Sequence, residues 1–298
     1  MDERAALARI SSALPAAGDD CAVVDGTVVT TDMLHETTDF PPGTTRYTAG
    51  WRAVGASLSD VAAMGADATA AVAVYAAPEF DPAELDAFLD GASAVCERAG
   101  AEYVGGDLDS HGEFTVATTA LGETENPIRR SNAAPGEAVC VTGTLGRSGA
   151  ALRLFERGQA TGNDADIERA NDLFRFTPRT AAGEALAPHA TAMMDSSDGL
   201  ARSLHQLSEA SDCGVEIGGE TVPIAPVVDE LAASREERRE LGLFFGEDFE
   251  LVCTVPRPEV EAAREDCPVP LSVVGEVTKE GVTMDGEPLP DRGFTHGS

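Results

Sequence analysis

Residues 44–66 read Thr44-Thr-Arg-Tyr-Thr-Ala-Gly-Trp-Arg-Ala-Val-Gly-Ala-Ser-Leu-Ser-Asp-Val-Ala-Ala-Met-Gly-Ala66. Small side chains dominate this stretch, which predicts a buried helix from about Thr44 to Met64. Gly65 ends the helix, because glycine readily adopts the left-handed backbone conformation that follows a helix. The apolar run Ala68–Ala76 comes next and predicts a strand.

The segments on both sides of this helix continue the mixture of strands and helices. Upstream, Asp25-Gly26 separates the apolar runs Cys21–Val24 and Thr27–Thr31, which is the pattern of a hairpin. Downstream, Asp81-Pro82-Ala83-Glu84 has the cap, the proline and the acid that begin a helix, and this helix extends to Gly100. Further strands are predicted near Glu102–Val104 and Glu113–Leu121.

The proline-containing segments Asn126-Pro127 and Ala134-Pro135-Gly136 indicate a boundary between two domains. We place it so that residues 1–133 form the first domain and residues 134–298 the second. Strands and helices start again beyond this boundary, and one helix is predicted at Ser197–Ser211. Because both halves mix strands and helices, the chain is predicted to be a two-domain α+β or α/β protein.

The composition is strongly acidic, with 21 basic and 52 acidic side chains among 298 residues and a net charge of −31. Such a charge disfavours binding to nucleic acid, whose phosphates attract basic proteins. The near absence of lysine, with Lys279 the only one, is typical of cytoplasmic proteins from cells that accumulate salt. In about 1 M salt charge repulsion is screened beyond roughly 3 Å. We expect a cytoplasmic protein, because no apolar run could cross a membrane and the N-terminus lacks a secretion signal.

Several aspartates stand at the ends of apolar segments, beside glycine or hydroxyl residues. Any one of them alone is more simply explained as a turn or a helix cap. Together they indicate a site, because loops converge at the ends of strands and helices. Carboxylates without histidine or cysteine suit Mg²⁺. The segments are Gly18-Asp-Asp20, Thr30-Thr-Asp32, Leu58-Ser-Asp60, Gly105-Gly-Asp107 and Asp195-Ser-Ser-Asp-Gly199.

The motifs of several common phosphate-handling enzymes are missing. With its one lysine at position 279, the chain has no P-loop and no kinase-type lysine. Its scattered cysteines and histidines do not have zinc-binding spacing. If the chain handles nucleotide phosphates, metal ions must supply most of the positive charge, and Arg130 is a candidate to assist them. Gly143-Thr-Leu-Gly146 fits a phosphate-binding turn and a plain strand-to-helix turn equally well.

Seven motifs carry a resemblance to a known family: Gly18-Asp-Asp-Cys-Ala-Val-Val, Thr30-Thr-Asp-Met-Leu, Leu58-Ser-Asp-Val-Ala-Ala-Met-Gly-Ala66, Gly105-Gly-Asp, Arg130-Ser-Asn-Ala-Ala-Pro-Gly, Met194-Asp-Ser-Ser-Asp-Gly-Leu200 and Phe245-Gly-Glu-Asp-Phe-Glu-Leu251. In order and spacing they resemble the thiamine-monophosphate kinase family. The third motif is shared with the wider aminoimidazole ribonucleotide synthetase superfamily, and the last two together are the most selective.

The resemblance implies ATP-dependent phosphorylation of thiamine monophosphate to thiamine diphosphate. It also implies an aminoimidazole ribonucleotide synthetase-like fold, in which the N-terminal α+β domain binds ATP and Mg²⁺ and forms the sheet of a homodimer, and an α/β-type C-terminal domain follows. The implied Mg²⁺ ligands are Asp20, Thr30, Asp32, Asp60, Asp107, Asp195 and Asp198, with Asp107, Asp195 and Asp198 as catalytic residues. The implied ATP contacts are Thr31, Gly106, Arg130 and Ser197. The implied substrate contacts are Asp39, Glu247 and Phe294.

The chemistry of this reaction is consistent with the missing motifs. Transfer between two phosphates needs positioning and charge neutralisation more than covalent chemistry. The phosphate of thiamine monophosphate is an ionised nucleophile, so we expect direct in-line transfer without a phosphoenzyme. Two positions depart from the family pattern: Asp39 stands where a histidine is usual, and Phe245 replaces the first glycine of Gly-Gly-Glu-Asp. The alternatives are another ATP-using enzyme of the same fold and a noncatalytic dimer that binds nucleotide or metal.

Overall fold

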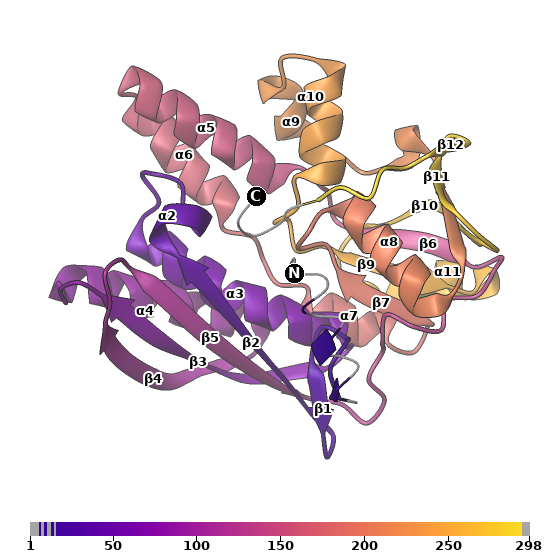
Figure 1. Ribbon diagram of the computed structural model, residues 1–298, viewed down its shortest axis with the longest axis horizontal. Helices are drawn as coiled ribbons and strands as arrows, with labels where there is room; N and C mark the ends of the chain where they lie inside the picture. The colour runs from indigo at the N-terminus through magenta and orange to yellow at the C-terminus, as the bar shows by residue number, and fades with distance from the viewer. Residues whose placement is uncertain (1–5, 7–8, 11–12, 15, 294–298) are drawn as a thin grey trace.

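The computed structural model describes residues 6, 9–10, 13–14 and 16–293, in which two sheets each pack against helices (Figure 1). The N-terminal sheet has five strands in the order β1-β2-β5-β3-β4, and the C-terminal sheet has seven in the order β12-β11-β8-β10-β6-β9-β7. Both sheets are mixed, because β3 pairs parallel with β4 and β8 pairs parallel with β11, whereas their other pairs are antiparallel. The α/β architecture predicted from the sequence, with strands and helices in both halves, is confirmed.

The N-terminal sheet is built from segments of the first 123 residues. Its strands are β1 (Ala22–Val24), β2 (Thr27–His35), β3 (Asp67–Ala77), β4 (Glu102–Ser110) and β5 (Thr115–Glu123). The helices beside it are α2 (Glu36–Asp39), α3 (Arg46–Ala63) and α4 (Pro82–Ala99). The predicted hairpin at Asp25-Gly26 is confirmed, and Asp81 caps α4 by accepting hydrogen bonds from the backbone N–H groups of Ala83 and Glu84.

Helix α3 is the buried helix that its small residues predicted, since 14 of its 18 residues are buried. It packs against α4 so closely that a Cβ atom at Gly50 would lie 2.3 Å from the carbonyl oxygen of Phe88. Both helices cover the same face of the N-terminal sheet (Figure 1). The small side chains therefore place α3 between the sheet and the second half of the chain, where its last turns can contribute to a site.

The other face of the N-terminal sheet is uncovered within the described residues and carries several exposed apolar side chains. Its exposed side chains include Met33, Val74 and Leu121, of which Met33 is 52% and Val74 39% exposed. Strand register places Met33, Ala117, Val74 and Asp107 in one row across β2, β5, β3 and β4. We name this face, carrying Met33, Val74, Leu121 and Asp107, the outward face.

The second half of the chain forms the C-terminal sheet and its helices. The strands are β6 (Ala138–Thr142), β7 (Ala192–Asp195), β8 (Gly214–Ile217), β9 (Leu251–Val255), β10 (Leu271–Thr278), β11 (Val282–Met284) and β12 (Glu287–Pro288). The α-helices are α5 (Arg147–Thr161), α6 (Asp164–Phe174), α7 (Thr180–Leu186), α8 (Leu200–Ser211), α9 (Pro226–Leu231), α10 (Arg235–Arg239) and α11 (Val260–Asp266). Short 3₁₀ turns η1 (Gly219–Thr221) and η3 (Arg257–Glu259) and a π-helical turn η2 (Glu240–Phe244) complete the set.

Three further predictions concern the start of α8, the domain boundary and the cellular location. The helix predicted from Ser197 begins at Leu200, because residues 196–199 form a turn between β7 and α8. The domain boundary between residues 133 and 134 stays a prediction. In the described part of the chain, each helix is too short or too polar to traverse a lipid bilayer, and the cytoplasmic location stays a prediction.

Candidate active site

Three aspartates from distant parts of the chain meet between the two sheets. Asp20 lies just before β1, Asp60 lies on α3 and Asp195 ends β7. One carboxylate oxygen from each lies within 4.8 Å of the other two. Three carboxylates at this spacing repel one another unless a proton or a cation lies between them, so this group is a candidate metal centre.

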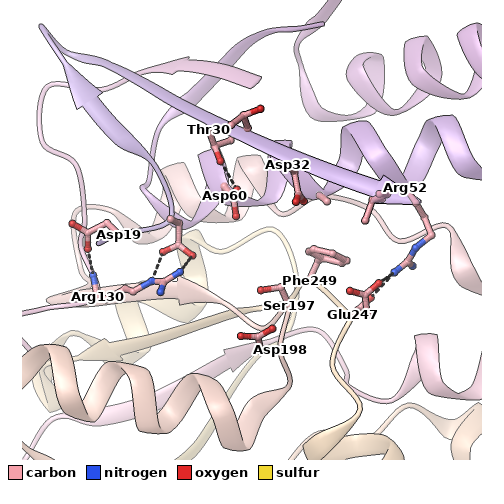
Figure 2. Close-up of a pocket in the computed structure, with 14 residues that line it drawn as sticks. Asp19, Thr30, Asp32, Arg52, Asp60, Arg130, Ser197, Asp198, Glu247 and Phe249 are labelled. Carbon is pink, nitrogen blue, oxygen red and sulfur yellow. Dashed lines mark hydrogen bonds and ion pairs between the residues drawn. The ribbon is translucent and has the colours of Figure 1, made fainter. Parts of the chain in front are cut away.

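Hydroxyl groups and an arginine hold these carboxylates in place (Figure 2). The Thr30 hydroxyl donates to Asp60 at 2.6 Å, and the Ser59 hydroxyl donates to Asp195 at 2.8 Å. Asp195 also accepts the backbone N–H and the hydroxyl of Ser197, at 3.2 and 2.9 Å. The group thus joins neighbouring residues of α3, Ser59 and Asp60, to strands of both sheets.

Arg130 provides the positive charge nearest to this group. Its Nη2 and Nε atoms donate to the two carboxylate oxygens of Asp20, at 2.8 and 3.1 Å. The adjacent Asp19 accepts the backbone N–H of Arg130 at 3.0 Å and the side chain of Arg129 at 2.6 Å. The carboxylates around it raise the pKa of Arg130, so its guanidinium stays charged.

Burial changes the protonation of the acidic group. Desolvation, with repulsion from Asp20, raises the pKa of Asp195 to about 7. Desolvation, with repulsion from Asp195 and Asp20, raises the pKa of Asp60 well above its ordinary value. A divalent cation would reverse these effects, because it stabilises the ionised carboxylates. Metal binding should therefore release protons.

We expect the metal-free protein to lose stability as the pH rises from about 5.5 to about 7.5. In this window ordinary carboxyl groups, with pKa values near about 4, are ionised in both folded and unfolded chains. Asp195, with its raised pKa of about 7, is protonated mainly in the folded chain at the lower pH, so folding binds protons and stability falls with pH. Thermal unfolding in EDTA at constant salt measures this slope. Asp195→Asn should make the slope shallower without removing it, because burial also raises the pKa values of Asp248, to about 7, and of Asp60. An equal slope in that variant would contradict the assignment.

A cavity of about 310 Å³ opens beside this group between the two sheets. Nine of the residues singled out from the sequence line it: Asp20, Thr30, Thr31, Asp32, Asp60, Arg130, Ser197, Asp198 and Glu247. Burial raises the pKa of Asp198, whose carboxylate faces the cavity near Ser197 (Figure 2). We name this space the acidic cavity.

Two of the predicted residues, Gly106 and Asp107, lie away from the acidic cavity. Gly106 and Asp107 lie on the edge strand β4, three strands from Asp32 on β2, or roughly 14 Å at ordinary strand spacing. Asp107 also pairs with Val74 on the outward face, whereas Asp32 pairs with the buried Thr118 and so lies on the opposite face of the sheet. Within one chain these two aspartates cannot share an ion. Phe294 lies outside the described residues.

A second cavity, of about 350 Å³, adjoins the first. Glu247 lines both. Asp39 lies in this second cavity, where its carboxylate accepts the backbone N–H of His35 at 2.7 Å. Its other walls include the aromatic side chains of Phe40, Phe174 and Phe245. We name it the aromatic cavity.

Sequence reasoning missed Arg52 and Phe249, both of which line the acidic cavity. The available signal for Arg52 was a charged residue within a helix of small residues. Sequence reasoning also left open the role of Gly143-Thr-Leu-Gly146. In the structure, the carboxylate of Asp248 accepts the N–H groups of Gly146 and Ser148, so a carboxylate of this chain already occupies that turn.

Both halves of the chain match domains of one known protein family. Residues 18–124 match the model of the AIR synthase related protein N-terminal domain, and residues 134–285 match that of the C-terminal domain. The chain is 59% identical to the thiamine-monophosphate kinase of Halobacterium salinarum, over 99% of this chain and 100% of that one. It is 32% identical to the Escherichia coli enzyme of that name, over 94% and 90%. Among solved structures, AaThiL complexed with AMPPCP and TMP superposes with a TM-score of 0.88 at 28% identity, over 99% and 97% of the two chains.

Proposed function

The chain belongs to the thiamine-monophosphate kinase family of AIR synthase related proteins, and on this premise we propose how its own residues perform the reaction. The activity is that of an ATP-dependent kinase that converts thiamine monophosphate to thiamine diphosphate. The observation that carries the proposed mechanism is the meeting of Asp20, Asp60 and Asp195 beside the acidic cavity.

The residues at this position fit Mg²⁺. They are hard oxygen donors, and the raised pKa values of Asp60 and Asp195 indicate that burial and mutual repulsion disfavour the ionised carboxylates until a cation neutralises them. We assign the ion to Asp20, Asp60 and Asp195, with Thr30, Asp32 and Asp198 beside them. When bound, Mg²⁺ neutralises the charge on the phosphates that react.

The other residues of the acidic cavity position the two phosphates. We assign Thr31, Arg130 and Ser197 to ATP, because all three line the cavity and Arg130 keeps its charge. The phosphate of thiamine monophosphate attacks the terminal phosphorus of ATP in line, and ADP leaves. No protein group needs to become phosphorylated, since the attacking oxygen is already ionised.

We assign the thiamine part of the substrate to the aromatic cavity. Thiamine carries a cationic thiazolium ring, which acidic and aromatic side chains attract. Asp39 and Glu247 supply carboxylates there, and Phe40, Phe174 and Phe245 supply aromatic walls. Because Glu247 lines both cavities, a substrate with its ring in one and its phosphate in the other would pass beside it.

We further propose that the active form is a homodimer joined through the outward face. An apolar sheet face with exposed Met33, Val74 and Leu121 is stable in water when another apolar surface covers it. A two-fold axis would also bring β4 of the second copy toward this chain. The Gly106 and Asp107 of one chain would then contribute to the metal and nucleotide site of the other.

The reaction is tested with purified protein, ATP, Mg²⁺ and thiamine monophosphate in molar KCl. We expect thiamine diphosphate and ADP in equal amounts, detected by chromatography, and no product when EDTA replaces Mg²⁺. High salt is part of the design because the net charge of −31 destabilises the compact chain in dilute buffer. Formylglycinamidine ribonucleotide as the alternative acceptor should give no ADP. Product with that acceptor alone would contradict the assignment.

A further inference from the structure

Arg52 is an arginine that neither the motifs nor the proposed mechanism uses. It lies on α3 with its side chain only 2% exposed. Its Nη1 atom donates to the carbonyl oxygen of Phe174 at 2.6 Å, and its Nη2 atom donates to the carboxylate of Glu247. The guanidinium lies 3.6 Å from the centre of the Phe174 ring. A charge buried this deeply costs free energy unless its hydrogen-bonding partners are fixed.

The partner of Arg52 lies in a strained loop. Glu247 and Phe249 have φ angles of 63° and 54°, the left-handed region that non-glycine residues rarely adopt. Phe249 stacks on Phe176 with ring centres 4.1 Å apart. Such a conformation persists only where neighbouring groups hold it, so the contacts of this loop decide where the Glu247 carboxylate lies.

Arg52 and two other groups hold the loop. The carbonyl oxygen of Glu247 accepts the Ser148 hydroxyl at 2.6 Å, and its N–H donates to the carbonyl oxygen of Ser197 at 2.6 Å. Those two bonds fix the backbone of Glu247, and Nη2 of Arg52 adds a longer bond of 3.4 Å to the same carbonyl oxygen. Among the described contacts of the Glu247 side chain, the bond from Arg52 is the one that fixes its carboxylate (Figure 2).

We propose that Arg52 is a positioning residue for thiamine monophosphate, because it fixes the Glu247 carboxylate at the boundary between the acidic and aromatic cavities. The inference rests on the proposed function, in which Glu247 contacts the substrate. The planar guanidinium serves this role because it donates to Phe174 and to Glu247 at once, and a lysine ammonium lacks that fork. Arg52 acts through Glu247, so it should change the affinity for the acceptor and leave that for ATP unchanged.

The test compares Arg52→Lys with Arg175→Lys in steady-state kinetics and in calorimetric binding of thiamine monophosphate. Arg175 is the matched control, because it also contacts α3, through the Thr48 hydroxyl at 2.9 Å, and lines neither cavity. We expect Arg52→Lys to raise KM and Kd for thiamine monophosphate about tenfold, the effect of one charge-assisted hydrogen bond. KM for ATP should change less than about twofold, as should every constant in the control.

A double-mutant cycle separates positioning from a general loss of structure. In a Glu247→Ala background, Arg52→Lys should change the Kd for thiamine monophosphate by less than about twofold, because the group it positions is gone. Additive effects, equal changes in the constants for ATP, or no change on Arg52→Lys would each overturn the inference. A wild-type protein that binds thiamine monophosphate with this Arg52 dependence, yet makes no diphosphate, would overturn the proposed reaction and support the role of Arg52.

Discussion

Asp195→Asn is expected to lower kcat about 10³-fold, the equivalent of about 4 kcal/mol of lost transition-state stabilisation. Asp195 is 1% exposed at the end of β7. Asparagine has the same shape but only one carboxylate-like oxygen and no charge. The variant keeps an acceptor for the Ser59 hydroxyl and removes the charge that a metal ion requires.

The same variant should be at least as stable as the wild type without metal. The wild-type carboxylate is buried beside Asp20 and Asp60, and removing one charge relieves their repulsion. Loss of activity with unchanged or higher thermal stability in EDTA would identify a functional carboxylate and exclude unfolding as the cause. Asp229→Asn serves as control, because Asp229 forms an exposed pair with Arg238. An unchanged kcat in Asp195→Asn would remove the metal role from Asp195.

A mixture of two inactive variants is expected to recover activity if the dimer completes the site. Asp107→Asn and Asp195→Asn should each be inactive alone. In a mixed dimer, one site would combine the intact Asp195 of the first chain with the intact Asp107 of the second. Each mixed dimer has one intact site of two, so the mixed dimer, once separated from the inactive homodimers, should have about half of wild-type activity.

The structural reason for this expectation is the position of Asp107. It lies on the outward face in the same row as Val74, and Asp32 lies on the opposite face of the sheet. Co-expression of the two variants with different tags, and purification through both tags, yields the mixed dimer for assay. Asp60→Asn mixed with Asp195→Asn is the matched control, because both residues belong to one group in the same chain and no mixed dimer restores it. Absence of recovery in the first mixture would show that Asp107 does not act across a dimer.

The parts of the fold that were predictable depend on neighbours in the sequence. Asp25-Gly26 predicts its hairpin because both residues tolerate the left-handed conformation, and the structure places them at φ angles of 51° and 83°. Asp81 predicts the start of α4 because a carboxylate caps free N–H groups a few residues away. The start of α8 was predicted three residues too early, because Ser197 bonds to Asp195 and remains in the turn.

The parts of the site that were not predictable depend on contacts between distant residues. Arg52 and Glu247 are 195 residues apart in the chain, and their pairing follows from how α3 packs against the second half of the molecule. The order of the strands likewise places Asp107 far from Asp32, although both are aspartates in motifs that resemble Mg²⁺-binding segments.

The sequence by itself determined the elements, the acidic motifs and the family they resemble, because propensity, capping and motif chemistry act over a few residues. Only the tertiary structure decided which aspartates meet, that Arg52 holds Glu247, and that one apolar sheet face stays uncovered in the described chain. Ser59 and Asp195, 136 residues apart, come within 2.8 Å because a buried helix and a buried strand end must pack without voids, and that constraint involves the whole chain.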